Sequence, residues 1–376
     1  MTREPLKRLE AGLPGPWYYD PAHYQRELEA FWYRRWVAVA REEELPNPGD
    51  WRVARIGTQS IVVLRGEDGS LRAFHNTCRH RGSILCIEER GNFARRRIVC
   101  PYHSWTYDLA GRLVATPRRM ETPDFEPGDF PLHAVAAAAW DGFVFLNLAG
   151  RDAPPLDVGN LEAQFARYAL GKLRIGKRIV ADVQANWKLV AENFSECFHC
   201  PPVHPELCRV VTAYREAGAW GLRGPEPRGE YAEGAETLTL DGSARLPPIG
   251  TLTEEERNTL YVPAMLPPSL FLNVHPDYVN AHLMTPTGPQ SVRIVYDWLF
   301  EADRLPLSDA DLQHYVALWD VTNRQDARNC EWQQQGIHSR AFAHGYYVPQ
   351  EFDCHRFAQW VRAGLAGKKP ADQAEG

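Results

Sequence analysis

The sequence has few cysteines, no excess of positive charge and no long apolar run. Eight cysteines in 376 residues are too few for a disulfide scaffold. The formal net charge of −6 creates no general attraction for nucleic acid or an anionic membrane. No stretch of about 18 uncharged apolar residues occurs, and the N-terminus lacks the apolar segment of a signal peptide. We therefore expect a cytoplasmic protein with no nucleic-acid or membrane partner, whose cysteines are mostly reduced and whose important cysteines bind metal or catalyse.

The composition is that of a folded globular chain, with 44% hydrophobic and 24% charged residues. Apolar spacing predicts a helix over residues 21–36. Short β-branched runs, separated by turns rich in Gly, Asp and Pro, predict an all-β domain over 37–148. Helical and strand-like segments are mixed in 149–376. The expected fold class is α+β, with an N-terminal helical segment (1–36), a β domain and a larger C-terminal domain.

The C-terminal domain is expected to contain an antiparallel sheet. Strand-like runs occur at KRIVADVQA, SLFLNV, YVNAHLMT and SVRIVYDWLF, and the last three are expected to be consecutive antiparallel strands. Helices are expected over 161–170 and from Asn186 to Cys200, where two prolines follow. Two or more helices are expected within 307–365. The Pro- and Gly-rich stretch 216–256 is expected to be an irregular excursion or a lid.

The first group of metal-binding residues lies in the β domain. Cys78 and His80 form C-x-H, and after 19 residues Cys100 and His103 form C-x2-H. Zinc fingers use the same residue types but pair like with like, C-x2-C followed by H-x3–5-H. A [2Fe–2S] centre of Rieske type binds two thiolates on one iron and two imidazoles on the other, so each loop supplies one of each. The mixed spacing favours the Rieske cluster over zinc.

The second group lies between Asn186 and Leu207. Glu192, Glu196 and His199 fall at i, i+4 and i+7, the spacing of one helix face, and His204 follows two prolines that let the chain fold back. Two histidines and a carboxylate with open coordination positions suit a ferrous ion that activates O2. Two alternatives are half of a zinc site, formed by Cys197 and Cys200 with His204, and two histidines satisfied within the core.

Both groups occur in a sequence that resembles Rieske non-haem iron oxygenases over roughly residues 20–360. NTCRHRG and CPYHSWTYDLAG are similar to the family's cluster loops, apart from Ser104 where the family more often has Gly. Respiratory Rieske proteins carry one more cysteine in each loop, whereas Cys86 has no counterpart in the second loop. We therefore expect Cys86 to be a buried, unpaired side chain.

The segment NWKLVAENFSECFHCPPVHPEL resembles the mononuclear-iron motif of the same family. The resemblance implies that His199 and His204 bind iron and that a carboxylate on a C-terminal helix is the third ligand. Asp326 aligns with it, whereas spacing alone leaves Glu331 and Asp320 open. Glu196 takes the position of a carboxylate that, in family trimers, links the iron-binding histidine to a cluster histidine of the neighbouring subunit.

The resemblance implies an all-β Rieske domain inserted into a helix-grip catalytic domain, assembled as a homotrimer. The chain has no G-x-G-x-x-G after a strand, so NAD(P)H and flavin are expected only on a separate reductase. The chain is then the terminal oxygenase component, with a Rieske [2Fe–2S] cluster, mononuclear Fe(II) and O2 as co-substrate. Its E-C-F-H-C followed by H-P-E-L resembles the branch that acts on quaternary ammonium compounds, which implies N-demethylation or hydroxylation of a betaine-like small molecule.

Two other functions stay open from the sequence: ring hydroxylation or O-demethylation of an aromatic acid or aryl ether, and a Rieske electron carrier. A cationic substrate would bind against aromatic faces, although each candidate can equally be a core residue. The candidates are Phe194, Phe271, Tyr278, Trp298, Trp319 and Trp332. The basic run 95–97 could dock an acidic reductase or be a solvated hairpin tip.

Overall fold

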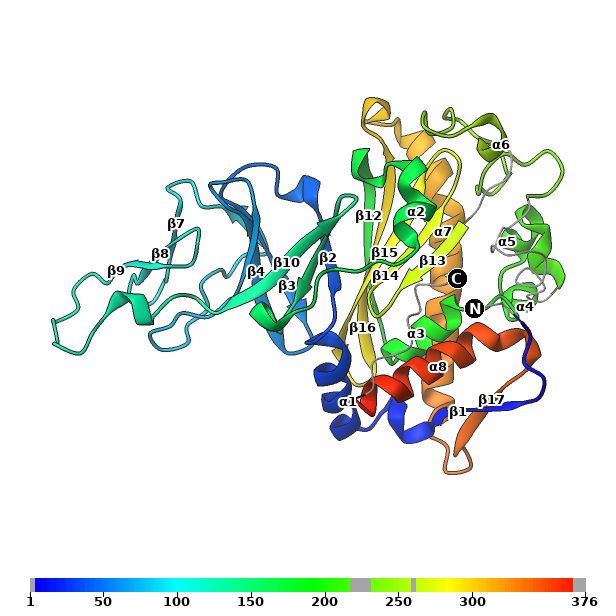
Figure 1. Cartoon of the computed structure of the whole chain (residues 1–376). Coiled ribbons are helices and arrows are strands. Elements are labelled where there is room, and N and C mark those ends of the chain that lie inside the picture. The colour runs from blue at the N-terminus through cyan, green and yellow to red at the C-terminus, as the bar shows by residue number, and fades with distance from the viewer. Residues whose placement is uncertain (1–3, 217–230, 258–261, 368–376) are drawn as a thin grey trace. The chain divides into compact units, whose positions relative to one another are not determined.

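The computed structural model describes residues 4–216, 231–257 and 262–367, and the chain divides into two compact units (Figure 1). One unit is discontinuous and consists of residues 1–30 and 157–376, and the other is the segment 31–156 inserted between them. These boundaries, at 30/31 and 156/157, lie six and eight residues from the expected ones at 36/37 and 148/149. The mixture of helices with antiparallel sheets confirms the predicted α+β class.

The inserted unit is built from strands and short turns. Its larger sheet has seven strands in the order β2-β11-β10-β5-β4-β3-β6, and a smaller sheet has the order β7-β8-β9. All paired strands are antiparallel. The strands are β2 (Val37–Arg41), β3 (Asp50–Ile56), β4 (Gln59–Arg65), β5 (Leu71–His75), β6 (Arg90–Asn92), β7 (Arg97–Val99), β8 (Thr106–Asp108), β9 (Leu113–Ala115), β10 (Ala134–Trp140) and β11 (Phe143–Asn147).

The other unit contains a five-stranded antiparallel sheet in the order β12-β16-β15-β14-β13. Its strands are β12 (Leu173–Val183), β13 (Val262–Leu266), β14 (Leu270–Val274), β15 (Val279–Gly288) and β16 (Ser291–Glu301). β14 pairs with β15 and β15 with β16, so the prediction of three consecutive antiparallel strands is confirmed. β14 is buried at every position, which means that both faces of the sheet are covered there. A two-stranded sheet joins β1 (Glu10–Pro14) to β17 (His344–Tyr347).

Eight α-helices lie in the described part of this unit. They are α1 (Pro21–Glu27), α2 (Leu161–Phe165), α3 (Trp187–Phe194), α4 (Cys200–Val203), α5 (Pro205–Val210), α6 (Glu254–Arg257), α7 (Asp309–Ile337) and α8 (Phe352–Leu365). α7 begins at an N-cap, Ser308, whose side chain accepts a hydrogen bond from the backbone of Asp311. The ring of Tyr315 on α7 packs against Phe300 of β16, and the ring of Trp319 packs against His282 of β15. The expected helices in 307–365 are therefore confirmed as α7 and α8.

Two expected helices are shorter than predicted. α1 ends at Glu27 and is followed by a π-helical turn, Leu28–Trp32, instead of continuing to residue 36. α3 ends at Phe194 instead of Cys200. The side chain of Ser195 donates to the carbonyl of Ala191, and the side chain of Glu196 accepts from the backbone N–H groups of Phe198 and His199. These local hydrogen bonds replace the helical ones and turn the chain.

The two prolines after Cys200 begin a helix rather than ending one. Pro201 and Pro202 occupy the first turn of α4, where the missing N–H of proline costs nothing. The resulting short helices α4 and α5 carry the chain back toward α7, since α5 contacts that helix. None of the helices in the described residues is long and apolar enough to cross a bilayer. Residues 217–230 of the expected excursion at 216–256 lie outside the described residues.

Candidate functional site

The four predicted cluster residues lie on two loops of the inserted unit. Cys78 and His80 follow β5, and Cys100 and His103 follow β7. A backbone hydrogen bond closes each loop: Cys78 N–H donates to the carbonyl of Ser83 (2.8 Å), and Cys100 N–H donates to the carbonyl of Trp105 (2.8 Å). The two imidazole rings lie with their centroids 4.7 Å apart. The structure therefore brings the two loop tips together.

The two cysteines and the two histidines differ in exposure. Cys78 and Cys100 belong to the hydrophobic core of this unit, whereas His80 is exposed and His103 half-buried. The buried hydroxyl of Tyr107 lies 3.3 Å from the sulfur of Cys78, and the indole of Trp105 stacks on His80. A cluster with its thiolate side inside and its imidazole side at the surface fits these donors.

Two further residues near these loops behave as expected from their chemistry. Ser104 has a positive φ of 55°, a left-handed conformation that glycine adopts without strain, which explains why the family more often has Gly there. Cys86 is buried and unpaired, as predicted. Burial raises the pKa of its thiol to about 12.

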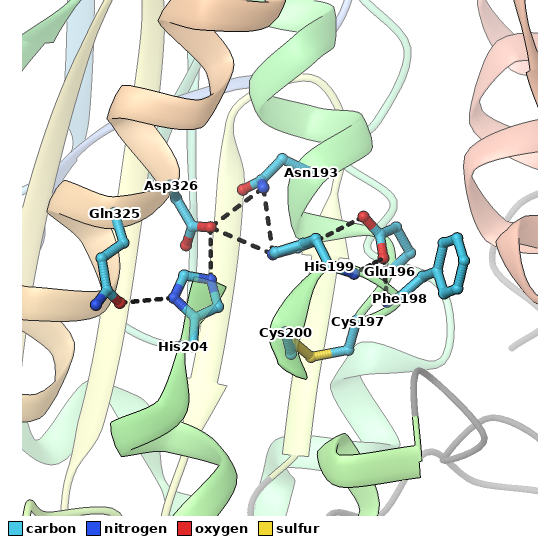
Figure 2. The surroundings of a disulfide bond; sticks show 9 residues. All are labelled: Asn193, Glu196, Cys197, Phe198, His199, Cys200, His204, Gln325 and Asp326. Carbon is cyan, nitrogen blue, oxygen red and sulfur yellow. Dashed lines mark hydrogen bonds and ion pairs between the residues drawn. A yellow bond between two sulfur atoms is a disulfide. The ribbon is translucent and has the colours of Figure 1, made fainter. Parts of the chain in front are cut away.

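The second site gathers around Asp326 on α7 (Figure 2). His199 lies in the turn between α3 and α4, and His204 lies between α4 and α5. The Nε2 atoms of His199 and His204 lie 3.3 Å and 2.8 Å from the same carboxylate oxygen, Oδ1 of Asp326. The three side chains that the sequence and the resemblance singled out thus converge on one point.

The opposite nitrogen of each ring is held by a hydrogen-bond acceptor (Figure 2). Nδ1 of His199 lies 2.5 Å from Oε1 of Glu196, and Nδ1 of His204 lies 2.7 Å from Oε1 of Gln325. Carboxylate and amide oxygens only accept, so each Nδ1 carries a proton. Such acceptors fix the ring orientation of metal-binding histidines. With Nδ1 held in this way, both Nε2 atoms face Asp326, where a cation would bind.

The electrostatics of this cluster call for a positive charge at the centre. Two Nε2 lone pairs and a carboxylate oxygen at these distances repel one another unless a proton or metal ion lies between them. Burial opposes a charge on His199, but the carboxylates of Asp326 and Glu196 outweigh it and raise the pKa of His199 to about 10. Burial also opposes ionisation of Asp326, yet hydrogen bonds from the two histidines hold its pKa well below the usual range. Two imidazoles and one carboxylate fit a ferrous ion.

The structure separates Asp326 from the other acidic candidates. Glu331 accepts a hydrogen bond from the backbone of Gln184, and Asp320 forms an ion pair with Arg324 one turn along the same helix. Glu192 does not share a face with Glu196 and His199, because the helix ends before them, and it points instead into a buried cluster with two tyrosines. The expectation of one common helix face is therefore wrong.

Two residues of the site were not predicted. Gln325 holds His204, and the side-chain amide of Asn193 lies 3.3 Å from Nε2 of His199 and donates to Asp326 (3.1 Å). The position of Asn193 within the motif was a signal for it, since it follows Glu192 directly. Nothing in the sequence distinguished Gln325 from the other glutamines of the same helix.

The cysteines beside His199 form an unexpected disulfide. Six of the eight cysteines are free, as expected for most of them, but Cys197 is bonded to Cys200. The sulfur of Cys200 and one ring nitrogen each of His199 and His204 lie within 4.8 Å of one another. A disulfide sulfur carries no thiolate charge, so the alternative of half a zinc site through these cysteines does not hold in this state.

His282 and Tyr296, which both interact electrostatically with Asp326, belong to a cluster of aromatic rings. The ring of His282 on β15 contacts those of Phe194, Tyr296 and Trp319, and Phe194 packs on Phe271. Burial lowers the pKa of His282 to about 3, so its ring is neutral, although Asp326 acts in the opposite direction. Of the remaining aromatic candidates, Tyr278 and Trp298 are fully buried core residues and Trp332 is exposed.

Two family models match the two units. Residues 35–126 match the Rieske [2Fe-2S] domain, and residues 170–367 match the ring hydroxylating alpha subunit (catalytic domain). The second match alone covers more than half of the chain.

Relatives and solved structures match over nearly the whole chain. The glycine betaine monooxygenase oxygenase subunit of Chromohalobacter salexigens is 33% identical, with 96% of this chain and 87% of the relative covered. The choline monooxygenase of Arabidopsis thaliana is 27% identical, with 94% and 82% covered. A solved quaternary ammonium Rieske monooxygenase, described with inter-subunit electron transfer, has a TM-score of 0.76 at 21% identity, with 94% and 95% covered. This last likeness concerns the fold.

Proposed function

The chain belongs to the ring hydroxylating alpha-subunit family of Rieske oxygenases, and on that premise we propose that it is the terminal oxygenase component acting on a quaternary ammonium substrate. It is an oxidoreductase, and its family implies a Rieske [2Fe–2S] cluster and a mononuclear iron. One observation carries the proposal: His199, His204 and Asp326 converge through Nε2, Nε2 and Oδ1 in a chain that also presents paired Cys and His loops.

Each metal group has its own ligand set in this proposal. Cys78 and Cys100 would hold one iron of the cluster through their buried thiolates, and His80 and His103 would hold the other through their less buried imidazoles. His199, His204 and Asp326 hold the mononuclear iron. A ferrous ion bound by these residues would supply the activation of O2 when electrons arrive from the reductase.

The protein groups around the iron ligands fix protons and orientation. Glu196 and Gln325 keep a proton on Nδ1 of each histidine, so that Nε2 faces the metal. Asn193 donates to the third ligand, Asp326, and so limits the rotation of its carboxylate. These contacts supply the preorganisation that a site on short helices and turns would otherwise lack.

Glu196 is the bridging residue of the proposed electron path. One of its oxygens is hydrogen-bonded to His199, and the other accepts hydrogen bonds from the backbone N–H groups of Phe198 and His199. A carboxylate has lone pairs to spare, so it could also accept an N–H from His103 of a neighbouring subunit. We infer a head-to-tail homotrimer from this arrangement, with a separate flavin- or ferredoxin-containing reductase that receives electrons from NAD(P)H in the cytoplasm.

The proposed reaction is hydroxylation of an N-methyl group on a betaine-like substrate. Relatives with glycine betaine and choline in their names align along almost the full chain. Phe194, Tyr296 and Trp319 cluster around His282, and aromatic rings are the side chains that bind a quaternary ammonium ion. Oxygen insertion at such a methyl group gives a carbinolamine, which releases formaldehyde, so the net outcome is N-demethylation.

The test is a substrate screen with purified chain, a surrogate reductase and NADH. Formaldehyde should form with glycine betaine or a related quaternary ammonium compound, and the His199→Ala variant should form none. Formaldehyde-free conversion of an aromatic acid, or demethylation of an aryl ether in place of the ammonium compounds, would assign the chain to the alternative branch. A Rieske electron carrier does not explain the family match over residues 170–367.

A further inference from the structure

The Cys197–Cys200 disulfide lies in the turn that carries two residues of the proposed iron site, Glu196 and His199 (Figure 2). Both cysteines are buried, and their Cα atoms are 5.0 Å apart, within the usual range for a disulfide. The backbone N–H of Cys200 also donates to the carbonyl of Cys197 at 3.2 Å. The disulfide therefore closes a single turn and constrains little beyond it.

Cys200 lies near enough to the two histidines that a side-chain rotation would make its sulfur a metal ligand. Its sulfur and one ring nitrogen of each histidine lie within 4.8 Å of one another. A metal about 2.0–2.1 Å from nitrogen and about 2.3 Å from sulfur joins donors that are up to about 4.4 Å apart. A small rotation of the freed Cys200 side chain would thus add a thiolate to His199 and His204.

A thiolate would change which metal the site prefers. Thiolate and imidazole together are the usual donors for zinc, whereas two imidazoles with one carboxylate and open positions suit ferrous iron. Zinc also binds most nitrogen and sulfur sites more tightly than Fe(II) does. A free Cys200 beside His199 and His204 would therefore favour a redox-inert ion at the place where the proposed function requires iron.

We propose that the Cys197–Cys200 disulfide is a positioning element that withholds the Cys200 sulfur from the metal and so preserves the site for iron. The proposal rests on the proposed mononuclear site formed by His199, His204 and Asp326. In this proposal Cys197 has a defined role, because its bond to Cys200 keeps the Cys200 sulfur from binding a metal. Among the described residues, that sulfur is a soft donor within reach of both histidines.

Three variants distinguish the effect of the Cys200 sulfur from the effect of opening the turn. Cys197→Ser opens the turn and frees the Cys200 thiol, whereas Cys197→Ser/Cys200→Ser opens the same turn and leaves no sulfur. The difference between them reports the thiolate alone. Cys208→Ser is the matched control, since Cys208 is a buried, unpaired cysteine on α5 outside the site.

The oxidation state is tested by alkylating the unfolded chain and locating the modified residues by mass spectrometry. Six modified cysteines are expected without reductant and eight after reduction, with Cys197 and Cys200 as the difference. Eight modified cysteines without reductant would overturn the proposal.

Whether the Cys200 sulfur binds the metal is tested by adding cobalt(II) to protein whose mononuclear metal has been removed. Difference absorption spectra cancel the contribution of the cluster. A thiolate-to-cobalt charge-transfer band is expected for Cys197→Ser and for neither the wild type nor the double variant. With equal Fe(II) and Zn(II) offered, the bound zinc-to-iron ratio of Cys197→Ser should rise about ten-fold over the double variant and Cys208→Ser, the lower end of effects for neighbours of metal ligands.

The outcomes distinguish this inference from the proposed function. Cobalt uptake by Cys197→Ser without the band, or with an unchanged zinc-to-iron ratio, would refute the role of the disulfide and leave the iron site intact. Cobalt uptake by the wild type that His199→Ala does not diminish would instead show that the proposed metal site is wrong, and the inference would fall with it.

Discussion

The orientation of two imidazole rings decides which nitrogens can bind a metal. Glu196 and Gln325 occupy the Nδ1 positions of His199 and His204, so that both Nε2 atoms face Asp326. The three donors come from a turn, a second turn and a long helix. A site assembled from such separate elements depends on hydrogen bonds for its geometry, because no single backbone segment dictates it.

Glu196→Gln should keep both metals and lose most turnover. The amide matches the carboxylate in size, but it is neutral. Its NH2 group would face N–H donors from which the carboxylate accepts hydrogen bonds. Loss of such a partner typically costs about 10–100-fold in activity. Glu196→Asp should be milder because the charge stays. After rapid mixing of reduced protein, substrate and O2, the cluster of the Gln variant should stay reduced, and normal reoxidation with product would remove Glu196 from the electron path.

Gln325→Leu should weaken the mononuclear site without touching the cluster. Removing the acceptor of His204 Nδ1 frees the ring to rotate, and the expected loss of Fe(II) affinity is about 10–100-fold. An Fe(II) titration of protein with an intact cluster spectrum measures this loss. Gln335→Leu, at an exposed position of the same helix, is the control and should bind iron like the wild type. Equal affinity for the two variants would show that Gln325 plays no part in holding His204.

Among the elements, α3 is the one that anchors the site. At its start, Lys188 is buried and bonded to Glu27 of α1 (2.5 Å) and to the N-cap side chain of Asn186 (2.8 Å). Near its end, Glu192 accepts hydrogen bonds from Tyr18 and Tyr347. Breaking one partner of a buried ion pair costs about 3–5 kcal/mol, so these contacts fix the helix that precedes the metal-binding turn.

Glu192 gives α3 a pH-dependent contribution to stability. Burial raises the pKa of Glu192 to about 7, above the usual 4.5, although the two tyrosines act in the opposite direction. Between pH 4.5 and pH 7 the folded state therefore keeps the proton on Glu192, whereas the unfolded state has released it. The contribution of Glu192 to the free energy of unfolding is fully present below pH 4.5 and is lost as the pH rises through 7. The loss is of the order of 3 kcal/mol.

Glu192→Gln should remove this pH dependence, since the amide stays neutral and can still accept from a tyrosine. Denaturation midpoints of the wild type and the variant, measured between pH 4.5 and pH 7, should diverge, with the wild type falling relative to the variant as the pH rises. Glu162→Gln, at an exposed position of α2, should follow the wild type throughout. Parallel curves for the wild type and Glu192→Gln would contradict the raised pKa.

The sequence predicted the strands and the long helices better than the turn at the site. β14, β15 and β16 carry strong β-branched and aromatic patterns, and their pairing follows from short connections. The i, i+4, i+7 spacing of Glu192, Glu196 and His199 predicted one continuous helix, because periodicity does not register side chains that bond to the backbone. Asp326 could be chosen only through the family resemblance, since Asp320 and Glu331 lie on the same helix. The disulfide had no distinctive signal.

For the whole molecule, the proposed electron path runs between subunits. In the proposed trimer, the cluster of one chain passes electrons to the mononuclear site of its neighbour. Two inactive chains, one with His103→Ala and one with His199→Ala, should then restore activity when they are co-expressed and assemble together. Transfer within one chain predicts that the mixture stays as inactive as its parts. Formaldehyde release by the co-purified mixture, compared with the two chains mixed after separate purification, distinguishes the two routes.

The central claim is that one chain holds two iron sites with separate ligands. Iron content measured together with the visible cluster spectrum tests it most directly. The wild type should hold about three irons per chain, two in the cluster and one mononuclear. His199→Ala should hold about two with an unchanged cluster spectrum, and Cys78→Ser should lose that spectrum and keep about one. A folded His199→Ala protein that retained the third iron, or that lost the cluster spectrum, would contradict the claim.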